Sequence, residues 1–404
     1  MNNTLLDQLA DNACWQRFYN YKKEHYESAE RLKELEEFIT NQKYLSILER
    51  IRRGEPFPLP RKAVINKVHS QKKRVVYVYP ADENIFLKAL THLLLREYDD
   101  LFAPNLYSFR PGRSAKDAVR RITRTPGIGA MYSYKADISN YFNSVNLSLF
   151  LPVLENILAD DQPLLTFLTA LLREENVIEN GSLIKEQKGI MAGTPLACFY
   201  ANIFLREMDF CFWENKVLYA RYSDDIIIFA EDAAKMAEYK EQIRIFLKEK
   251  GLVINPEKEF ETAPGEKWTF LGCSYQDGTV DISPISVLKL KAKMRRKRDA
   301  LQRWRNRKGL DGWKAGKAFI RVFNRKLYDN PKMHDLTWAR WYFPVITTPE
   351  SLRELDHYAE DCVRYLVSGR HTKARFNVRY ADLKEMGFRS LVHEYYAAIK
   401  DDEE

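Results

Sequence analysis

Two adjacent aspartates, Asp224 and Asp225, stand between two short apolar runs, and they are the residues that most directly indicate chemistry. The runs, Val217–Tyr222 and Ile226–Phe229, are rich in β-branched and aromatic residues, so we predict a strand–turn–strand hairpin with one or both carboxylates at its exposed tip. Neighbouring carboxylates repel each other and are tolerated in water or around a cation. Because Asp is also a common turn residue, the pair alone indicates either an ordinary turn or a metal site.

A third aspartate, Asp137, lies near the end of another predicted strand, Tyr134–Ile138. The long stretch between Asp137 and Asp224 leaves room for a helical crossover, so the strands can pair and bring three carboxylates to one sheet edge. Such an oxygen-ligand cluster suits two Mg²⁺ ions roughly 3.5–4 Å apart. A metal pair of this kind activates a hydroxyl and stabilises a pyrophosphate leaving group. The three acids therefore predict phosphoryl-transfer chemistry.

The elements that must position these acids are a mixture of helices and strands. Residues 4–55 show a helical pattern, and proline-rich residues 56–60 end it. We predict further strands at Lys73–Tyr79 and Thr269–Ser274 and a helix that begins near Ser114, with Asp117 completing its cap. Other helices are expected at residues 84–98, 152–158, 164–173, 196–208, 233–249 and 287–308. This pattern predicts an α+β fold in which helices back a sheet.

Composition restricts the classes of protein and partner. The 404 residues are 45% hydrophobic and 30% charged, as in an ordinary globular protein, and the net charge of +8 favours a polyanionic partner. No Cys-x-x-Cys or His-x-x-x-His pair occurs, which argues against a zinc site. We expect reduced thiols and a soluble, cytoplasmic protein without membrane partners, since neither a signal-peptide pattern nor an apolar run of about 20 residues is present.

Five ordered motifs between about residues 60 and 280 resemble those of bacterial reverse transcriptases. They are the catalytic box Tyr222–Asp225, the first acidic motif Asp137–Phe142, the fingers motif Tyr107–Ala118, the template-helix motif Ala192–Asn202 and the primer grip Phe270–Gly272. The resemblance implies a right-hand polymerase with fingers, a ferredoxin-like palm and a helical thumb with a C-terminal extension. The expected boundaries are N-terminal helices and fingers at 1–130, palm at 131–280, basic helical thumb at 281–345 and helical extension at 346–404.

The resemblance also implies roles for individual residues. Asp137 and Asp224 would each contact both metal ions, Asp225 would assist one of them, and the Ile138 carbonyl would complete the ligand set. The residues expected at the incoming deoxynucleotide are Arg74, Arg110, Arg113, Phe142, Gly193 and Lys258. Phe142 would exclude a ribose 2′-hydroxyl, and Lys258 would act as a general acid near the pyrophosphate. The alternatives are that the arginines and Lys258 are surface charges and that Phe142 is a core aromatic.

Residues outside the catalytic cluster would hold the nucleic acids. Tyr222, Leu271 and Gly272 are expected beside the template or primer. The helix at 287–308 contains eleven Lys or Arg residues, and we expect Lys289, Lys293, Arg296 and Lys297 to contact duplex phosphates without reading sequence.

Two positions depart from the usual family pattern. Ala192 replaces a glutamine, and Ala197-Cys198 replaces Ser-Pro. Together with the compact length, these departures resemble the defence-associated branch of bacterial reverse transcriptases. That branch implies antiphage defence with a structured non-coding RNA as template or scaffold, and cDNA as product. The alternatives are a template-independent DNA polymerase and a maturase-like RNA-binding protein.

Overall fold

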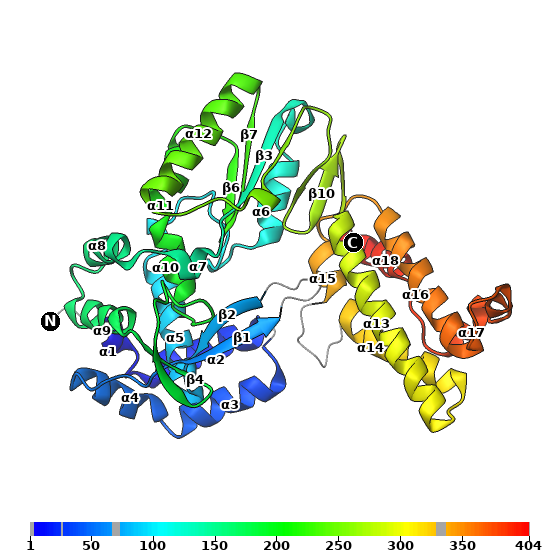
Figure 1. The fold of residues 1–404 in the computed structure, drawn as a ribbon, viewed down its shortest axis with the longest axis horizontal. Helices are drawn as coiled ribbons and strands as arrows, with labels where there is room; N and C mark the ends of the chain where they lie inside the picture. Colours follow the sequence, from blue (N-terminus) through cyan, green and yellow to red (C-terminus); the bar gives the residue numbers. More distant parts are fainter. Residues whose placement is uncertain (1–3, 26, 67–72, 329–336, 404) are drawn as a thin grey trace. The chain divides into compact units, whose positions relative to one another are not determined.

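The computed structural model describes residues 4–25, 27–66, 73–328 and 337–403. The chain forms two compact units, Met1–Pro264 and Gly265–Glu404. The predicted α+β class is confirmed, because the described residues form helices together with three separate sheets (Figure 1). No helix among the described residues combines the length and apolar character needed to span a membrane.

The first unit begins with helices, as the sequence predicts. They are α1 (Leu5–Gln8), α2 (Asn12–Glu24), α3 (Ala29–Thr40), α4 (Lys43–Arg52) and α5 (Ala81–Glu97). Trp15 is fully buried among the rings of Phe38, Tyr44 and Phe86, which joins α2, α3, α4 and α5. Buried aromatic rings of this size contribute most of the apolar burial of such a layer, so they fix the helices around α5.

A four-stranded sheet in this unit has the order β2-β1-β4-β5. Its strands are β1 (Arg61–Asn66), β2 (Lys73–Val78), β4 (Asn176–Glu179) and β5 (Ser182–Lys185). The pairs β1–β2 and β4–β5 are antiparallel, whereas β1 and β4 run parallel. Only β2 was predicted from the sequence.

The sheet that carries the acids has the order β6-β7-β3-β8 and is antiparallel at every pair. Its strands are β3 (Tyr132–Asp137), β6 (Tyr219–Tyr222), β7 (Asp225–Ala230) and β8 (Phe260–Thr262). The residues Ile226–Ala230 of β7 are all buried, and α12 packs against β3 and β7 (Figure 1). A strand buried on both faces has a continuous apolar sequence, which is why β7 was recognisable.

The remaining helices of this unit link or cover the two sheets. They are α6 (Ala115–Thr123), α7 (Tyr141–Ser144), α8 (Leu147–Ile157), α9 (Gln162–Arg173), α10 (Ala197–Phe204), α11 (Arg206–Glu214) and α12 (Ala233–Glu249), with 3₁₀ turns at 99–101, 128–130 and 256–258. Ser114 caps α6, and its hydroxyl donates to Asp117, as predicted. The prediction of a single helix at 196–208 is wrong, because the helix is interrupted at Leu205, between α10 and α11.

The second unit combines a small sheet with a helical bundle. Strands β9 (Trp268–Phe270), β10 (Cys273–Gln276) and β11 (Thr279–Ile282) pair in the order β11-β10-β9. The helices are α13 (Pro284–Lys308), α14 (Gly312–Leu327), α15 (Trp338–Tyr342), α16 (Glu350–Ser368), α17 (Tyr380–Glu385) and α18 (Leu391–Glu403), with a 3₁₀ turn at 373–377. The single strand predicted at 269–274 is wrong, since a hairpin turn at Leu271-Gly272 divides it.

Candidate active site

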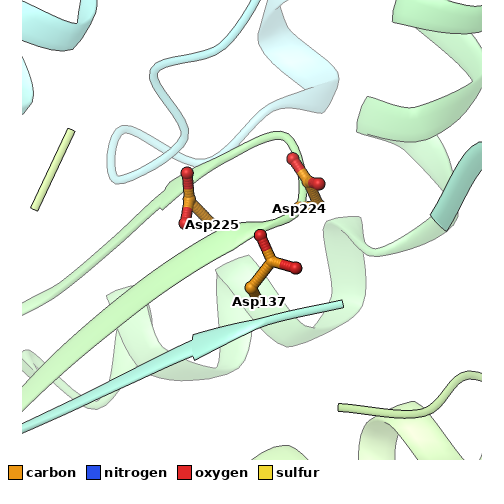
Figure 2. Close-up of side chains that lie close together, drawn as sticks. All are labelled: Asp137, Asp224 and Asp225. Atoms are coloured by element: carbon orange, nitrogen blue, oxygen red, sulfur yellow. The ribbon is translucent and has the colours of Figure 1, made fainter. Parts of the chain in front are cut away.

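The three acids predicted to cluster do so at one edge of the β6-β7-β3-β8 sheet. Strand pairing places Asp137, the last residue of β3, opposite Asp225, the first residue of β7. Asp224 lies in the two-residue turn of the β6–β7 hairpin, and its carbonyl accepts a 3.0 Å hydrogen bond from the Ile138 N–H. Oxygen atoms of all three carboxylates lie within 4.8 Å of one another (Figure 2).

The hairpin turn that presents Asp224 is conformationally specialised. Ser223, the first residue of the turn, has φ 60°, a region that favours glycine but also occurs in tight hairpins. The Ser223 carbonyl accepts a 3.2 Å hydrogen bond from the guanidinium of buried Arg221. The adjacent side chain therefore stabilises a backbone conformation that aims the two aspartates at Asp137.

The electrostatics of the cluster favour a bound cation. Burial raises the pKa of Asp224, and the nearby Asp137 charge raises it further. Burial and the charges of Asp224 and Asp137 raise the pKa of Asp225 to about 6, although Lys135 opposes the shift. Three oxygen ligands in mutual repulsion fit a hard divalent ion such as Mg²⁺, because its charge removes that repulsion.

Two lysines lie against the acids. Lys258 Nζ is 2.5 Å from Asp137 Oδ2, and the Lys258 side chain is 48% exposed while that of Asp137 is 7% exposed. Lys135 Nζ lies 3.9 Å from Asp225 Oδ1. The structure brings Lys258 to the acidic cluster, while its predicted place near a pyrophosphate stays a prediction. The pair with Asp137 leaves the lysine side chain about half exposed to solvent.

A buried ion pair beneath the hairpin was not predicted from the sequence. Arg221 on β6 donates to both carboxylate oxygens of Asp209 on α11, at 2.8 and 2.5 Å, and both side chains are fully buried. Tyr219 also donates to Asp209 at 2.9 Å. The same arginine donates to the Asn202 carbonyl on α10. The sequence signal for this ion pair is a lone arginine within an apolar strand, since a buried charge requires a partner.

The backbone of Arg221 connects the hairpin to the motif at 107–118. The Tyr107 N–H donates to the Arg221 carbonyl at 3.0 Å, and the Arg221 N–H donates to the Asn105 carbonyl at 3.1 Å. Ser108 and Asn202 exchange two hydrogen bonds, side chain to side chain and side chain to backbone. Three motifs that are distant in sequence are thus fixed to one another behind the acids.

Arg110, which was predicted to hold the triphosphate, forms hydrogen bonds with Asp99 and with a loop carbonyl instead. It is 7% exposed and donates to both carboxylate oxygens of Asp99, at 2.7 and 2.8 Å, and to the Ala103 carbonyl at 2.8 Å. Arg113 donates to the Pro104 carbonyl at 2.8 Å. Both arginines therefore stabilise the loop before α6, and this geometry contradicts the predicted triphosphate role of Arg110, whose donors are already occupied.

Arg74 is placed differently from the other two arginines. It is exposed on β2. Burial, the Asp137 charge and the Lys258 charge have larger effects on the pKa of Asp224. The positive charge of Arg74 has a smaller effect, and it lowers that pKa. The nucleotide contact of Arg74 therefore stays a prediction, made for an exposed side chain whose charge acts on Asp224.

Phe142 lies in the short helix α7, five residues beyond Asp137. It is half-buried, its ring centroid is 5.6 Å from that of Tyr141, and its carbonyl accepts a hydrogen bond from the Ile190 N–H. A Cβ on Gly189 would collide with the Phe142 carbonyl oxygen. The loop 188–193 therefore packs closely on α7 and limits how far Phe142 can move.

Gly193 makes a close backbone approach, but to a strand. Its φ is +94°, and a Cβ there would lie 2.8 Å from Val76 Cβ on β2. The Tyr77 N–H donates to the Ala192 carbonyl at 2.8 Å, and the Asn143 side chain accepts from the Ala192 N–H at 3.1 Å. Gly193 is needed for packing against β2, and because the residue is also exposed, its contact with a template remains a prediction.

The predicted nucleic-acid contacts fall in both units. Tyr222 is partly exposed at the hairpin, 6.2 Å from the Phe109 ring. In the second unit, Leu271 and Gly272 form the β9–β10 turn with φ 47° and 85°. On α13, Lys289, Lys293 and Arg296 are exposed and Lys297 is partly exposed, while Val287, Leu290, Met294 and Leu301 are buried.

Comparison with known proteins supports the geometry. Residues 65–275 match the family described as reverse transcriptase (RNA-dependent DNA polymerase). The group II intron-encoded protein LtrA of Lactococcus lactis subsp. cremoris is 25% identical over 190 residues, which are 47% of this chain and 31% of that protein. The matched part thus spans about a third of the length of the curated relatives.

Solved structures with similarity to this chain include telomerases. Apo telomerase from Candida tropicalis aligns with a TM-score of 0.47 and 13% identity over 86% of this chain and 64% of that one. Telomerase from Candida albicans, with a fragment of telomeric RNA, aligns with a TM-score of 0.45 and 13% identity over 83% and 62%. The family match covers more than half of the chain and includes all three clustered aspartates, so the chain belongs to the reverse transcriptase family.

Proposed function

We propose that this protein is an RNA-directed DNA polymerase whose catalytic residues are Asp137, Asp224 and Asp225. The observation that carries the proposal is the convergence of these carboxylates within 4.8 Å inside the segment that matches the family. Two Mg²⁺ ions held by the three carboxylates and the Ile138 carbonyl would supply charge neutralisation and activation of the primer hydroxyl.

The chain's own groups divide the remaining tasks. Arg74 binds the triphosphate by its guanidinium. Lys258 leaves its ion pair with Asp137, pairs with the pyrophosphate and donates a proton to the pyrophosphate. Phe142 closes the space that a ribose 2′-hydroxyl would occupy. Arg221 acts as a positioning residue, since it fixes the Ser223 carbonyl and thereby the direction of Asp224. Tyr222, Leu271, Gly272 and the α13 cations contact template and primer.

The finer assignment is the defence-associated branch, in which a structured non-coding RNA serves as template and the cDNA acts against phage. It is supported by the motif departures at Ala192 and Cys198 and by the basic helices of the second unit. Template-independent synthesis and maturase-like RNA binding are the competing activities.

One experiment separates these activities. The wild type and Asp224→Ala/Asp225→Ala are purified from cells that carry the native locus, and the bound RNA and the DNA made with Mg²⁺ and dNTPs are sequenced. DNA complementary to one enriched RNA, absent in the mutant, supports the proposal. DNA unrelated to any bound RNA indicates untemplated synthesis, and specific RNA without DNA in either preparation indicates an RNA-binding protein.

A further inference from the structure

One end of the helical bundle in the second unit concentrates the positive charge of the whole protein. Two segments, residues 303–317 and 369–380, contain ten Lys or Arg residues and one acid, Asp311, which is a net charge of +9. The full chain has a net charge of +8, so all other residues together have a net charge of −1. Together with residues 289–298 of α13, which contain seven Lys or Arg and no acid, these segments are the parts of the second unit best suited to attract a polyanion.

The two segments are neighbours in space. The first contains the turn between α13 and α14, and the second follows the end of α16. Arg305 Nη1 donates to the Leu366 carbonyl at 2.9 Å, and a Cβ on Gly312 would collide with the Val367 carbonyl oxygen. These contacts join the α13–α14 turn to the last turn of α16, and a Cβ on Gly369 would lie 2.9 Å from Arg305 Nη1, so the two segments adjoin where the second one begins. We call the two segments together the basic–aromatic surface (residues 303–317 and 369–380).

The cations of this surface face solvent. Arg307, Lys308, Lys314, Arg370 and Lys373 are all exposed. An exception is Arg375, whose Nε lies 2.6 Å from Asp361 Oδ1, so its charge is balanced within the bundle. Exposed cations gain little from isolated surface pairing, and several on one surface repel one another. A bound polyanion relieves this repulsion and releases its counterions.

Aromatic rings are interleaved with these cations. Phe376 is 53% exposed and Tyr380 is 39% exposed. The guanidinium carbon of Arg375 lies 4.5 Å from the centroid of the Phe376 ring, and this contact orients the ring on the surface. Trp304 and Trp313 are partly exposed in the first segment, and Lys317 Nζ lies 5.9 Å from the Trp313 centroid.

We propose that the basic–aromatic surface binds unpaired nucleotides of an RNA, with its cations on phosphates and Phe376 stacked on a base. Exposed rings among cations are the two components of single-strand recognition, whereas a duplex offers phosphates but hides its base faces. The inference rests on the proposed function only for the choice of RNA over DNA. The surface does not include the α13 cations at 289–297 that were predicted to follow the primer–template duplex.

The test measures binding by the full chain without dNTPs, using a labelled oligouridylate of about 16 nucleotides and fluorescence anisotropy over a salt series. The charge variant is Lys314→Gln/Arg370→Gln/Lys373→Gln, and the aromatic variant is Phe376→Leu. A matched control, Lys33→Gln/Arg53→Gln/Lys235→Gln, removes three exposed cations from helices of the first unit. Primer extension on a pre-annealed RNA–DNA hybrid is measured in parallel, because it reports the catalytic site independently.

The charge variant should reduce the slope of log affinity against log salt by about 2, since each lost single-strand phosphate contact removes about 0.7. Phe376→Leu should weaken binding about tenfold without changing the slope, and the control should match wild type. Equal affinity in all four proteins, equal loss in the control, preference for a duplex probe, or displacement by polyglutamate would each overturn the proposal. Wild type that binds RNA but extends no primer would instead refute the proposed polymerase.

Discussion

Phe142 is the residue proposed to set sugar selection. It is half-buried, and the loop 188–193 packs on its backbone carbonyl, so the backbone that carries the ring has little room to shift. Phe142→Ala is expected to raise the ratio of ribonucleotide to deoxynucleotide incorporation on the order of 100-fold, measured by single-nucleotide extension. Phe142→Tyr keeps the bulk of the ring and should preserve discrimination. An unchanged ratio in Phe142→Ala would remove this side chain from the sugar site.

The arginines predicted to hold the triphosphate separate into two kinds. Arg74→Gln is expected to raise the KM for dNTPs about tenfold and leave thermal stability unchanged, because we propose that its exposed guanidinium binds the triphosphate. Arg110→Gln should instead lower the free energy of unfolding by about 3 kcal/mol, since Asp99 and the loop carbonyls lose their donor. Chemical denaturation and steady-state kinetics on both variants check the assignment. The reverse pattern would restore Arg110 to the nucleotide site.

At the scale of elements, the Asp209–Arg221 pair connects α11, α10 and the catalytic hairpin. Asp209→Leu leaves a buried, unpaired guanidinium and should cost about 3–5 kcal/mol of stability. The double variant Asp209→Leu/Arg221→Met removes both charges and is expected to recover most of that loss. It still lacks the donor to the Ser223 carbonyl, so DNA synthesis should stay reduced about tenfold or more. A double variant with full activity would show that the pair serves stability alone.

The N-terminal helices contain a separate acid-sensitive contact. His92 on α5 packs against Tyr21 with tilted rings whose centroids are 4.2 Å apart, and burial lowers the pKa of His92 to about 4. Between that value and the ordinary pKa near 6.5, the unfolded chain binds more protons, so stability falls as the pH falls through this window. His92→Phe is expected to reduce the loss between pH 7 and 4.5 by about 2 kcal/mol in denaturant titrations. Equal losses of stability in the wild type and in His92→Phe would contradict the lowered pKa of His92.

At the scale of the whole molecule, the sequence predicted the α+β class, most helices and the three clustered acids. Those predictions depended on local signals: apolar periodicity, caps such as Ser114, and adjacent aspartates between β-rich runs. The prediction that the strand ending near Asp137 pairs with the hairpin is also confirmed, and the β3–β7 register adds that Asp137 lies opposite Asp225.

The predictions that failed depended on contacts between distant segments. Strands β4 and β5 have only four residues each, and β1 pairs with β4 in parallel across more than a hundred residues, which leaves no local pattern for that pairing. The Leu271-Gly272 turn required positive φ at both residues, although only glycine adopts it readily. Arg110 was predicted to bind a phosphate because the motif at 107–118 contains no acid close to it. Its partner, Asp99, lies in the 3₁₀ turn at 99–101, outside that motif.

The measurement that tests the central claim most directly is extension of a DNA primer on an RNA template by purified protein with Mg²⁺ and dNTPs. Asp224→Asn/Asp225→Asn is compared with Glu238→Gln/Glu241→Gln, which removes two exposed charges from α12. We predict template-directed extension by wild type and the α12 variant, and none by the aspartate variant although it still folds and binds RNA. Extension by the aspartate variant, or none by folded, RNA-bound wild type, would contradict the account.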